Sequence, residues 1–301
     1  MRNNRFVRKS AAYLKLGKAT ISLPVALTAL LGHVLYRSGL NPDSLLVVAG
    51  VFLLSLGSAS INQIQERKTD ALMPRTRNRP LPAGILSLPE AVVFAVLCLS
   101  AGTLLLILSG PLLAALLGLF TAGWYNLVYT PLKRKSAFAV LPGALIGALP
   151  PLIGWSAAGG NLFHPTILMV SFFLFMGQMP HYWLLLIRIG GEFSQAGLPV
   201  ITDRFSASQI RNLSFVWITA ATVTVLVFPV TGVLLHQGAS LLLVSASLLF
   251  IVRMFVYTYR DELFQKWKNA FITVNLFYLF IILILLADRL WPDGEILISL
   301  H

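Results

Sequence analysis

The chain has 301 residues, of which 57% are hydrophobic and only 11% are charged, and its mean hydropathy is +0.80. Soluble domains carry about 25% charged residues, so this composition excludes an ordinary soluble protein. A net charge of +12 would favour nucleic acid as the partner of a soluble protein. In a membrane protein the same charge reflects basic cytoplasmic loops, so we expect no nucleic-acid partner. The composition therefore predicts an all-α polytopic protein of the lipid bilayer.

Nine apolar runs are long enough to cross a bilayer, which takes about 20 residues. The first follows a basic segment, as in a signal peptide, but it lacks a clear cleavage site and further spans follow, so we expect it to be retained. We expect a single domain over residues 1–301, with nine helices around a central cavity. Spans 1–4 and 5–8 are predicted to form two similar bundles, to which span 9 is added. The predicted spans cover residues 19–37, 44–64, 90–108, 111–130, 137–157, 165–187, 213–235, 239–257 and 271–290.

Basic residues predict the orientation of these spans. If the N-terminus is cytoplasmic, all but two of the 23 Lys and Arg residues fall on the cytoplasmic side, the exceptions being Arg37 and Arg289. Cytoplasmic loops of membrane proteins are enriched in Lys and Arg. We therefore expect a cytoplasmic N-terminus and an external C-terminus in the inner (cytoplasmic) membrane. The outer loops are short, so we expect the functional site on the cytoplasmic side.

A strongly polar segment, residues 61–84, separates the second and third spans. Its residues Asn62, Glu66 and Asp70 are spaced four apart, so on a helix they share one face. Carboxylate and amide oxygens are hard ligands that suit Mg²⁺, which usually also takes substrate phosphate oxygens. The arginines that follow at positions 75, 77 and 79 suit phosphate oxygens as well.

Mg²⁺ and arginines beside an apolar cavity favour a substrate with a diphosphate head and a hydrocarbon tail. The alternative interpretation is a solvated loop with ion pairs at the membrane surface. Spacing alone does not distinguish the two.

The same segment resembles the first signature, N-x-x-x-D-x-x-x-D, of the UbiA superfamily of intramembrane prenyltransferases. Within that superfamily it is most similar to the protoheme IX farnesyltransferases, or haem O synthases, whose version is N-x-x-x-D-R-x-x-D followed by M-x-R-T-x-x-R-P-L. Glu66 replaces the first Asp, which keeps the charge but moves the carboxylate outward by one methylene. The matching residues are Asn62, Arg67, Asp70, Met73, Arg75, Thr76, Arg79, Pro80 and Leu81.

Further segments resemble the same family. Tyr129 to Ser136 resembles Y-T-x-x-L-K-R-x-T, and Gly143 to Trp155 resembles G-A-L-P-P-L-x-G-W. The segment from residue 177 resembles W-Q-x-P-H-F followed by D-Y-x-x-A-G-x-P-M-L, and "LKLGKAT" around Lys18 resembles L-T-K-P-R without its Pro and Arg. The chain departs from these patterns at Gly177 in place of Trp, Glu192 in place of Asp, and Thr202-Asp203 where Leu-Pro is common.

The resemblance implies a Mg²⁺-dependent enzyme that transfers a farnesyl group from farnesyl diphosphate to a vinyl group of protoheme IX (haem B). The implied metal ligands are Asn62, Glu66, Asp70 and Glu192. The implied catalytic residues are Glu66, Asp70 and Lys133. The implied diphosphate-binding residues are Arg67, Arg75, Arg79 and Arg134. The side chains expected to face the acceptor or the allylic cation are His181, Tyr125 and Tyr129.

The sequence leaves alternatives open for the role of His181, for the acceptor and for the class of protein. His181 is equally consistent with a contact to haem and with a buried hydrogen bond to a neighbouring helix. The acceptor is haem B or, given the substitutions at Gly177, Glu66 and Thr202-Asp203, an aromatic quinone precursor. A non-catalytic membrane carrier is the third alternative. It is disfavoured because the acidic residues and Arg79 are all present.

Overall fold

The computed structural model of the chain describes residues 2–260 and 267–291, with the side chains of residues 2–8, 188 and 267 excluded. Within these ranges every regular element is helical, and nine helices are long and apolar enough to cross a membrane. The predicted fold class is therefore confirmed. The C-terminus, predicted to lie outside the cell, falls beyond the described residues.

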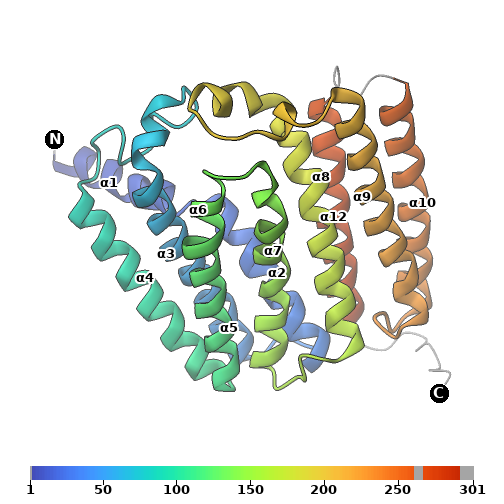
Figure 1. Ribbon diagram of the computed structural model, residues 1–301. Coiled ribbons are helices and arrows are strands. Elements are labelled where there is room, and N and C mark those ends of the chain that lie inside the picture. Colours follow the sequence, from blue (N-terminus) through green and yellow to red (C-terminus); the bar gives the residue numbers. More distant parts are fainter. Residues whose placement is uncertain (1, 261–266, 292–301) are drawn as a thin grey trace.

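Each predicted run corresponds to one helical span (Figure 1), but the second continues to Leu72 instead of ending at residue 64, and the seventh covers Ala207–Val230 instead of 213–235. The fourth span combines a π-helical turn, η1 (Trp124–Tyr129), with α-helix on both sides, and the fifth begins with a 3₁₀ turn, η2 (Ala137–Ala139). The α-helices that form the spans are α2 (Ala19–Arg37), α3 (Pro42–Leu72), α4 (Leu88–Ser109), α5 (Leu112–Gly123), α6 (Thr130–Leu132), α7 (Val140–Ala157), α8 (Pro165–Gln195), α9 (Ala207–Val227), α10 (Gln237–Tyr259) and α12 (Trp267–Leu290).

Helix ends follow local sequence signals. The backbone N–H of Ser44 donates to Oδ1 of Asn41 at 2.9 Å, which caps α3, and Pro42 occupies the first helical position. Ser87 and Glu90 form the corresponding capping box at the start of α4. Because Pro111 cannot continue a helix, α4 ends at Ser109 and α5 begins at Leu112, as the sequence predicts.

Helices α2 and α7 cross in the middle of the molecule at a reciprocal glycine contact. A Cβ at Gly32 of α2 would overlap the carbonyl oxygen of Pro151, and a Cβ at Gly154 of α7 would overlap the carbonyl oxygen of Ala29. Glycine is therefore required at both positions, since only it lets the two backbones approach this closely. These two helices open the two predicted four-helix sets, but the division into two similar bundles stays a prediction.

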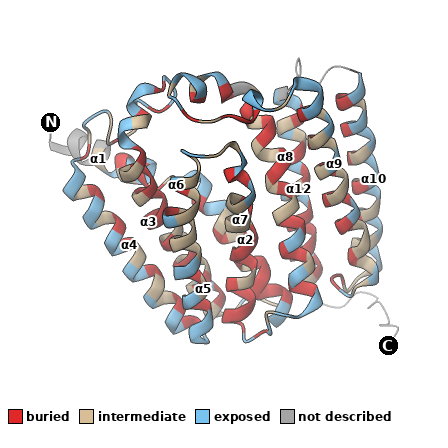
Figure 2. Cartoon of the chain, in the orientation of Figure 1, coloured by how far each residue is buried: buried red, intermediate tan, exposed pale blue. Residues whose placement is uncertain are grey.

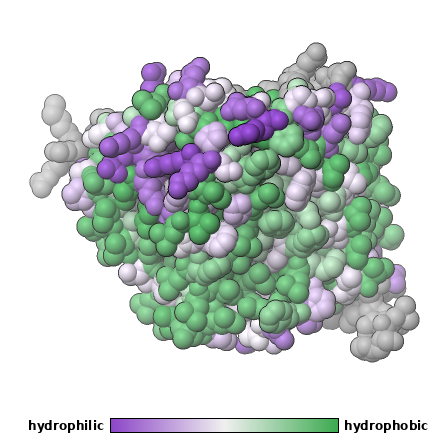
Figure 3. Space-filling model, viewed as in Figure 1, coloured by the Kyte–Doolittle hydropathy of each residue, from purple (hydrophilic) through white to green (hydrophobic). Residues whose placement is uncertain are grey.

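Burial follows the expected pattern for a bundle in lipid. Figure 2 shows buried residues on the inward sides of the helices and exposed residues on the outward sides. Many exposed side chains are large and apolar, including Leu97 on α4 and Leu249 on α10. Figure 3 shows this apolar surface over most of the molecule and hydrophilic side chains gathered at one end.

That hydrophilic end carries the two long loops, α3–α4 and α8–α9, which approach each other across the top of the bundle (Figure 1). It also carries an unpredicted helix, α1 (Arg2–Leu16), in what the sequence suggested was a basic tail. Nζ of Lys9 in α1 is 2.6 Å from Oε1 of Glu90 in α4, and Leu16 is fully buried. Helix α12 ends at the opposite end of the bundle, where Asp288 accepts the backbone N–H groups of Leu235 and His236.

Candidate active site

The polar face predicted for α3 exists and is buried. Asn62, Glu66 and Asp70 are only 1%, 6% and 1% exposed, and they lie on one edge of the helix. α3 continues to Leu72, well past its apolar part, and this extension carries the two carboxylates into the space between the long loops. Buried carboxylates are costly unless they are paired, so their partners define the chemistry of the site.

Asp70 is held from two directions. Nη1 of Arg79 lies 2.7 Å from its Oδ2, and the hydroxyl of Thr76 donates to its main-chain carbonyl at 2.8 Å. Its other carboxylate oxygen, Oδ1, is buried and has no hydrogen-bond partner among the described residues. An unsatisfied buried acceptor costs about 1–3 kcal/mol. A cation or a hydrogen-bond donor from a ligand would satisfy this oxygen.

Glu66 pairs with a residue from a distant part of the chain. Its Oε1 lies 2.7 Å from Nζ of Lys133, which follows α6 at the start of the loop after the fourth span. The Lys133 ammonium also lies 5.8 Å from the ring centre of Phe193. This contact joins the ends of α3, α6 and α8, so the acidic signature and the "LKR" segment share one site.

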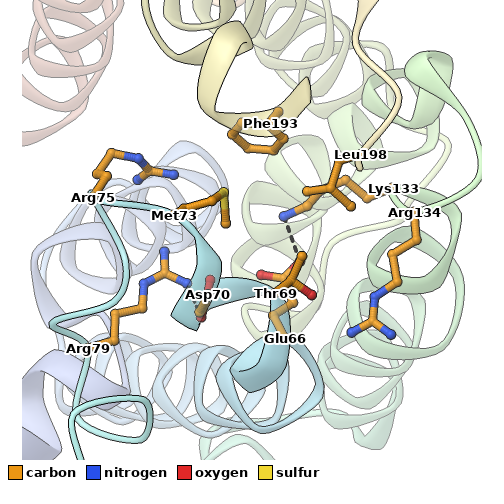
Figure 4. A pocket seen from close by; sticks show the side chains of 10 residues that line it. All are labelled: Glu66, Thr69, Asp70, Met73, Arg75, Arg79, Lys133, Arg134, Phe193 and Leu198. Carbon is orange, nitrogen blue, oxygen red and sulfur yellow. Dashed lines mark hydrogen bonds and ion pairs between the residues drawn. The ribbon is translucent and has the colours of Figure 1, made fainter. Parts of the chain in front are cut away.

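These residues surround a small pocket between α3, the α3–α4 loop, α6 and α8 (Figure 4). Its volume is about 20 Å³ with the side chains in these positions, which is room for about one ion or water molecule, so a larger anion requires the lining side chains to move apart. Four cationic side chains face two carboxylates here, so the pocket favours an additional anion. The cations are Arg75, Arg79, Lys133 and Arg134, and Phe193 and Leu198 cover the pocket.

Six of the predicted site residues do not line this pocket: Asn62, Arg67, Glu192, His181, Tyr125 and Tyr129. The exposed Arg67 does not line the pocket, and its Nη1 donates to the carbonyl of Ile64 at 2.8 Å. It follows Glu66 directly and is therefore turned about 100° around α3. Glu192 lies beside the pocket, where its Oε2 accepts the backbone N–H of Arg75 at 3.3 Å. The described residues hold no group of three or more His, Cys, Asp and Glu placed to bind one metal ion, so the three predicted acidic ligands, Glu66, Asp70 and Glu192, are not grouped around one position.

Of the two interpretations of His181, the structure shows the hydrogen bond to a neighbouring helix. Nδ1 of His181 lies 2.8 Å from Oδ1 of Asn275 on α12, and its ring packs against Phe271. It lines neither the polar pocket nor the apolar cavity described below. The structure therefore shows a helix-to-helix hydrogen bond at His181 and no contact with the predicted site.

Lys18 is a site residue that sequence reasoning missed. Its Nζ donates to Oδ1 of Asn62 at 2.8 Å and lies 3.5 Å from the hydroxyl of Tyr125. Nδ2 of Asn62 donates to the hydroxyl of Thr130 at 3.1 Å, so both ends of the amide are engaged. Lys18 occupies a left-handed turn (φ 51°) between α1 and α2, which directs it inward. The only sequence signal was its place in a partial match to L-T-K-P-R.

The environment of Lys18 is unfavourable for a charge. Its side chain is half-buried and lines the apolar cavity described below. This desolvation, reinforced by the positive charges of Arg79 and Lys133, lowers the pKa of the Lys18 ammonium to about 7. An anion bound nearby would stabilise the charged form of this ammonium.

The two predicted tyrosines lie on the π-helical turn η1. The rings of Tyr125 and Tyr129 stack with centres 5.7 Å apart and planes 18° apart. π-Helical turns are rare and are often found at functional sites. Here the turn places both rings below the polar pocket, and Nζ of Lys133 lies 6.0 Å from the Tyr129 ring centre.

An apolar cavity of about 190 Å³ lies deeper in the bundle, between α2, α3, α5 and α7. Val51, Leu54 and Ser58 of α3 line it, on the same helical face that carries Glu66 and Asp70 further along. Lys18 and Tyr125 form its upper wall. One face of α3 thus connects the cationic pocket with the apolar cavity.

Fold and site define a class of protein: a multi-pass membrane protein with a cationic pocket next to an apolar intramembrane cavity. Comparison with known proteins shows which family of membrane proteins this is. A model of the UbiA prenyltransferase family matches residues 25–284. The chain belongs to this family of prenyltransferases, so the resemblance seen in the sequence is confirmed.

Curated relatives cover most of the chain. The protoheme IX farnesyltransferase of Oleidesulfovibrio alaskensis is 35% identical over 90% of this chain and 94% of its own length. The protoheme IX farnesyltransferase of Geobacter sulfurreducens is 36% identical over 75% of this chain and 83% of its own.

Solved structures confirm the fold. A digeranylgeranylglyceryl phosphate synthase structure aligns with a TM-score of 0.75 at 16% identity, covering 94% of this chain and 99% of that one. A UbiA homologue from Archaeoglobus fulgidus bound to GPP and Mg²⁺ aligns with a TM-score of 0.65 at 16% identity, covering 91% and 99%. At these identities the likeness establishes the shared architecture.

Proposed function

We propose that this protein transfers a farnesyl group from farnesyl diphosphate to a vinyl group of protoheme IX and so forms haem O. The curated relatives named above support this acceptor. The observation that carries the proposal is the buried Asp70, whose Oδ1 has no partner in the described structure although four cations surround the pocket. A diphosphate accompanied by a metal ion satisfies both features.

The residues present fit Mg²⁺. Oδ1 of Asp70 is a buried oxygen ligand without a partner, and the Glu66 carboxylate lines the same pocket. Two carboxylates with phosphate oxygens and water form the usual Mg²⁺ environment. When bound, Mg²⁺ would neutralise negative charge on the diphosphate. Asn62 and Glu192 would join only after release from Lys18 and the Arg75 backbone.

The cationic side chains bind and stabilise the leaving group. Arg75, Arg79 and Arg134 provide forked donors for the phosphate oxygens, and Lys133 adds a fourth positive charge. Lys18 lies where the polar pocket meets the apolar cavity, next to the bond that breaks. The C1–O bond cleaves, its electron pair leaves with the diphosphate, and the cations stabilise the charge that develops there.

The apolar cavity protects the allylic carbon. Val51, Leu54 and the other cavity residues hold the farnesyl chain and keep water from C1. The stacked rings of Tyr125 and Tyr129 present π-electrons to the developing positive charge. C1 then bonds to the terminal vinyl carbon of the acceptor. Water adds to the other vinyl carbon with loss of one proton, which gives a hydroxyethylfarnesyl group.

We place the site at the cytoplasmic face of the inner membrane. The pocket is lined by residues of the α3–α4 and α8–α9 loops, and these loops lie at the hydrophilic end of the bundle (Figure 3). Cytoplasmic loops carry an excess of Lys and Arg, so this end faces the cytoplasm. Farnesyl diphosphate then enters the pocket from the water-facing side while its tail lies in the bundle.

One experiment tests the function. Membranes containing the protein are incubated with haem B, labelled farnesyl diphosphate and Mg²⁺, and the products are identified by mass spectrometry. We expect labelled haem O from the wild type and none from Asp70→Asn. Label in an aromatic quinone precursor, with no haem product, would overturn the proposed acceptor, and no transfer to either would indicate a carrier.

A further inference from the structure

Arg253 is a charged side chain inside a membrane span. It belongs to α10, whose apolar stretch covers Gln237–Tyr259, and it is exposed on the outer surface of the bundle. Its Nη2 donates to the hydroxyl of Tyr257 at 2.8 Å, and its guanidinium lies 5.1 Å from the centre of that ring. Among the described residues no carboxylate pairs with it. A lipid-facing charge at such a position requires an anion or water.

An apolar groove begins at Arg253 and runs between α10 and α12. Its volume is about 510 Å³. The rings of Phe250 and Phe277 form its floor, stacked in parallel with centres 3.9 Å apart. Seven residues separate Arg253 from Ala246 at the far end, so the groove extends about 10 Å toward the opposite face. Its walls are formed by Leu249, Leu276, Leu279, Phe280 and Leu283.

Arg253 lies at a depth in the membrane from which its side chain can reach the phosphate of a lipid head group. It lies six residues before the end of α10 at Tyr259, which is about 9 Å along the helix. An Arg side chain bridges most of such a distance by extending toward the interface. Arg260 at the end of α10 and Lys268 in the first turn of α12 are exposed at the same end. Among the described residues, the charged side chains named at the open end of the groove are therefore cationic, and its length is apolar.

We propose that this groove binds one anionic phospholipid, with its phosphate on Arg253 and one acyl chain along Phe250 and Phe277. Arginine binds phosphate oxygens through two parallel donors, and Tyr257 holds the guanidinium in place for this contact. Phospholipid is the anion that the bilayer supplies at this depth. The charge at one end of the groove and the apolar walls along it match that ligand.

Binding has a structural consequence that is independent of prenyl transfer. The lipid occupies the outer seam between α10 and α12, and α12 contacts α8 through Asn275 and His181. A bound chain therefore supports the packing of α12 against the rest of the bundle. The lipid should raise the thermal stability of the protein without contact with the polar pocket.

The test uses the full-length protein and two matched variants. Arg253→Gln removes the cation at the groove, and Lys68→Gln removes an equally exposed cation from α3, away from the groove. Each protein is studied in nanodiscs of phosphatidylcholine with or without phosphatidylglycerol. Native mass spectrometry counts retained lipids, and the melting temperature reports stability.

We expect the wild type and Lys68→Gln to retain phosphatidylglycerol and to melt at a higher temperature in its presence. Arg253→Gln should lose both effects and keep the same melting temperature in pure phosphatidylcholine, which shows that it folds. Leu249→Trp should also release the lipid by filling the groove. Equal retention of phosphatidylglycerol by Arg253→Gln, equal retention of phosphatidylcholine by the wild type, or a second copy of the chain in place of lipid would each overturn the proposal.

Discussion

Arg79 binds one carboxylate oxygen of Asp70 at 2.7 Å and leaves the other buried without a partner in the described structure. The pairing fixes the orientation of the carboxylate, since Arg79 comes from the α3–α4 loop and Asp70 from the end of α3. A carboxylate held in this way presents a negatively charged oxygen to the pocket at no further cost in side-chain entropy. This pre-organised oxygen is the basis of the first prediction.

Asp70→Asn should abolish prenyl transfer and leave the fold intact. The amide keeps the size of the side chain but loses the charge that attracts a cation. We expect turnover to fall by at least about 10²–10³-fold, the usual loss when one group that stabilises a transition state is removed. The measurement is haem O formation at several Mg²⁺ concentrations, with size-exclusion chromatography as the folding control. Retained activity would show that the metal site is elsewhere.

Variants of Glu66 test whether the replacement of the Asp in the family signature by Glu affects turnover. The Glu66 carboxylate lies 2.7 Å from Nζ of Lys133, and the shorter Asp side chain would withdraw it by one methylene. We expect Glu66→Asp to keep turnover within about tenfold of the wild type, because the charge remains. Glu66→Gln should lose about 10²-fold, since it removes the charge. Equal losses in both variants would show that the position of the carboxylate matters more than its charge.

Lys18→Met should slow the reaction more than it weakens substrate binding. The ammonium donates to Asn62 at the wall of the apolar cavity, and the proposed mechanism places the breaking C1–O bond next to it. An interaction made mainly in the transition state lowers kcat and kcat/KM together. Lys15→Met is the matched control, because Lys15 is exposed and three residues earlier. A rise in KM alone would assign Lys18 to ground-state binding.

Local patterns in the sequence predicted the spans and the acidic face of α3. Both depend on short-range regularities: runs of about 20 apolar residues, and the four-residue spacing of Asn62, Glu66 and Asp70. The basic tail was different. Residues 2–16 form a helix whose Ala12 and Leu16 pack in one cluster with Leu86 and Ala91, far along the chain.

The rest of the site required tertiary structure. Lys18 reaches the pocket through a left-handed turn between two helices, and no local pattern predicts which way such a turn directs its side chain. Arg67 was included because it matches the family motif, although its place next to Glu66 turns it away on a regular helix. The partner of His181 is Asn275, which is 94 residues away and belongs to the last span.

Gly177 stands where the related motif has Trp, and the structure supplies the reason. A Cβ at Gly177 would lie only 2.6 Å from the hydroxyl oxygen of Tyr278, whose ring from α12 covers this part of α8. The Tyr278 ring packs with its centre 4.9 Å from that of Phe173, which leaves it little freedom to move. The volume that Trp would occupy is thus filled from another helix.

Gly177→Ala should therefore destabilise the protein by about 1–3 kcal/mol, the usual range for overpacking a core. Gly191→Ala is the control, because it lies on the same helix and a Cβ there meets no atom within 4 Å. The melting temperature in detergent should fall for Gly177→Ala and stay the same or rise for Gly191→Ala. Tyr278→Leu, combined with Gly177→Ala, should recover part of the loss, because the smaller side chain frees space for the new methyl group. Equal melting temperatures for the two glycine variants would mean that Tyr278 moves aside and that the α8–α12 contact is loosely packed.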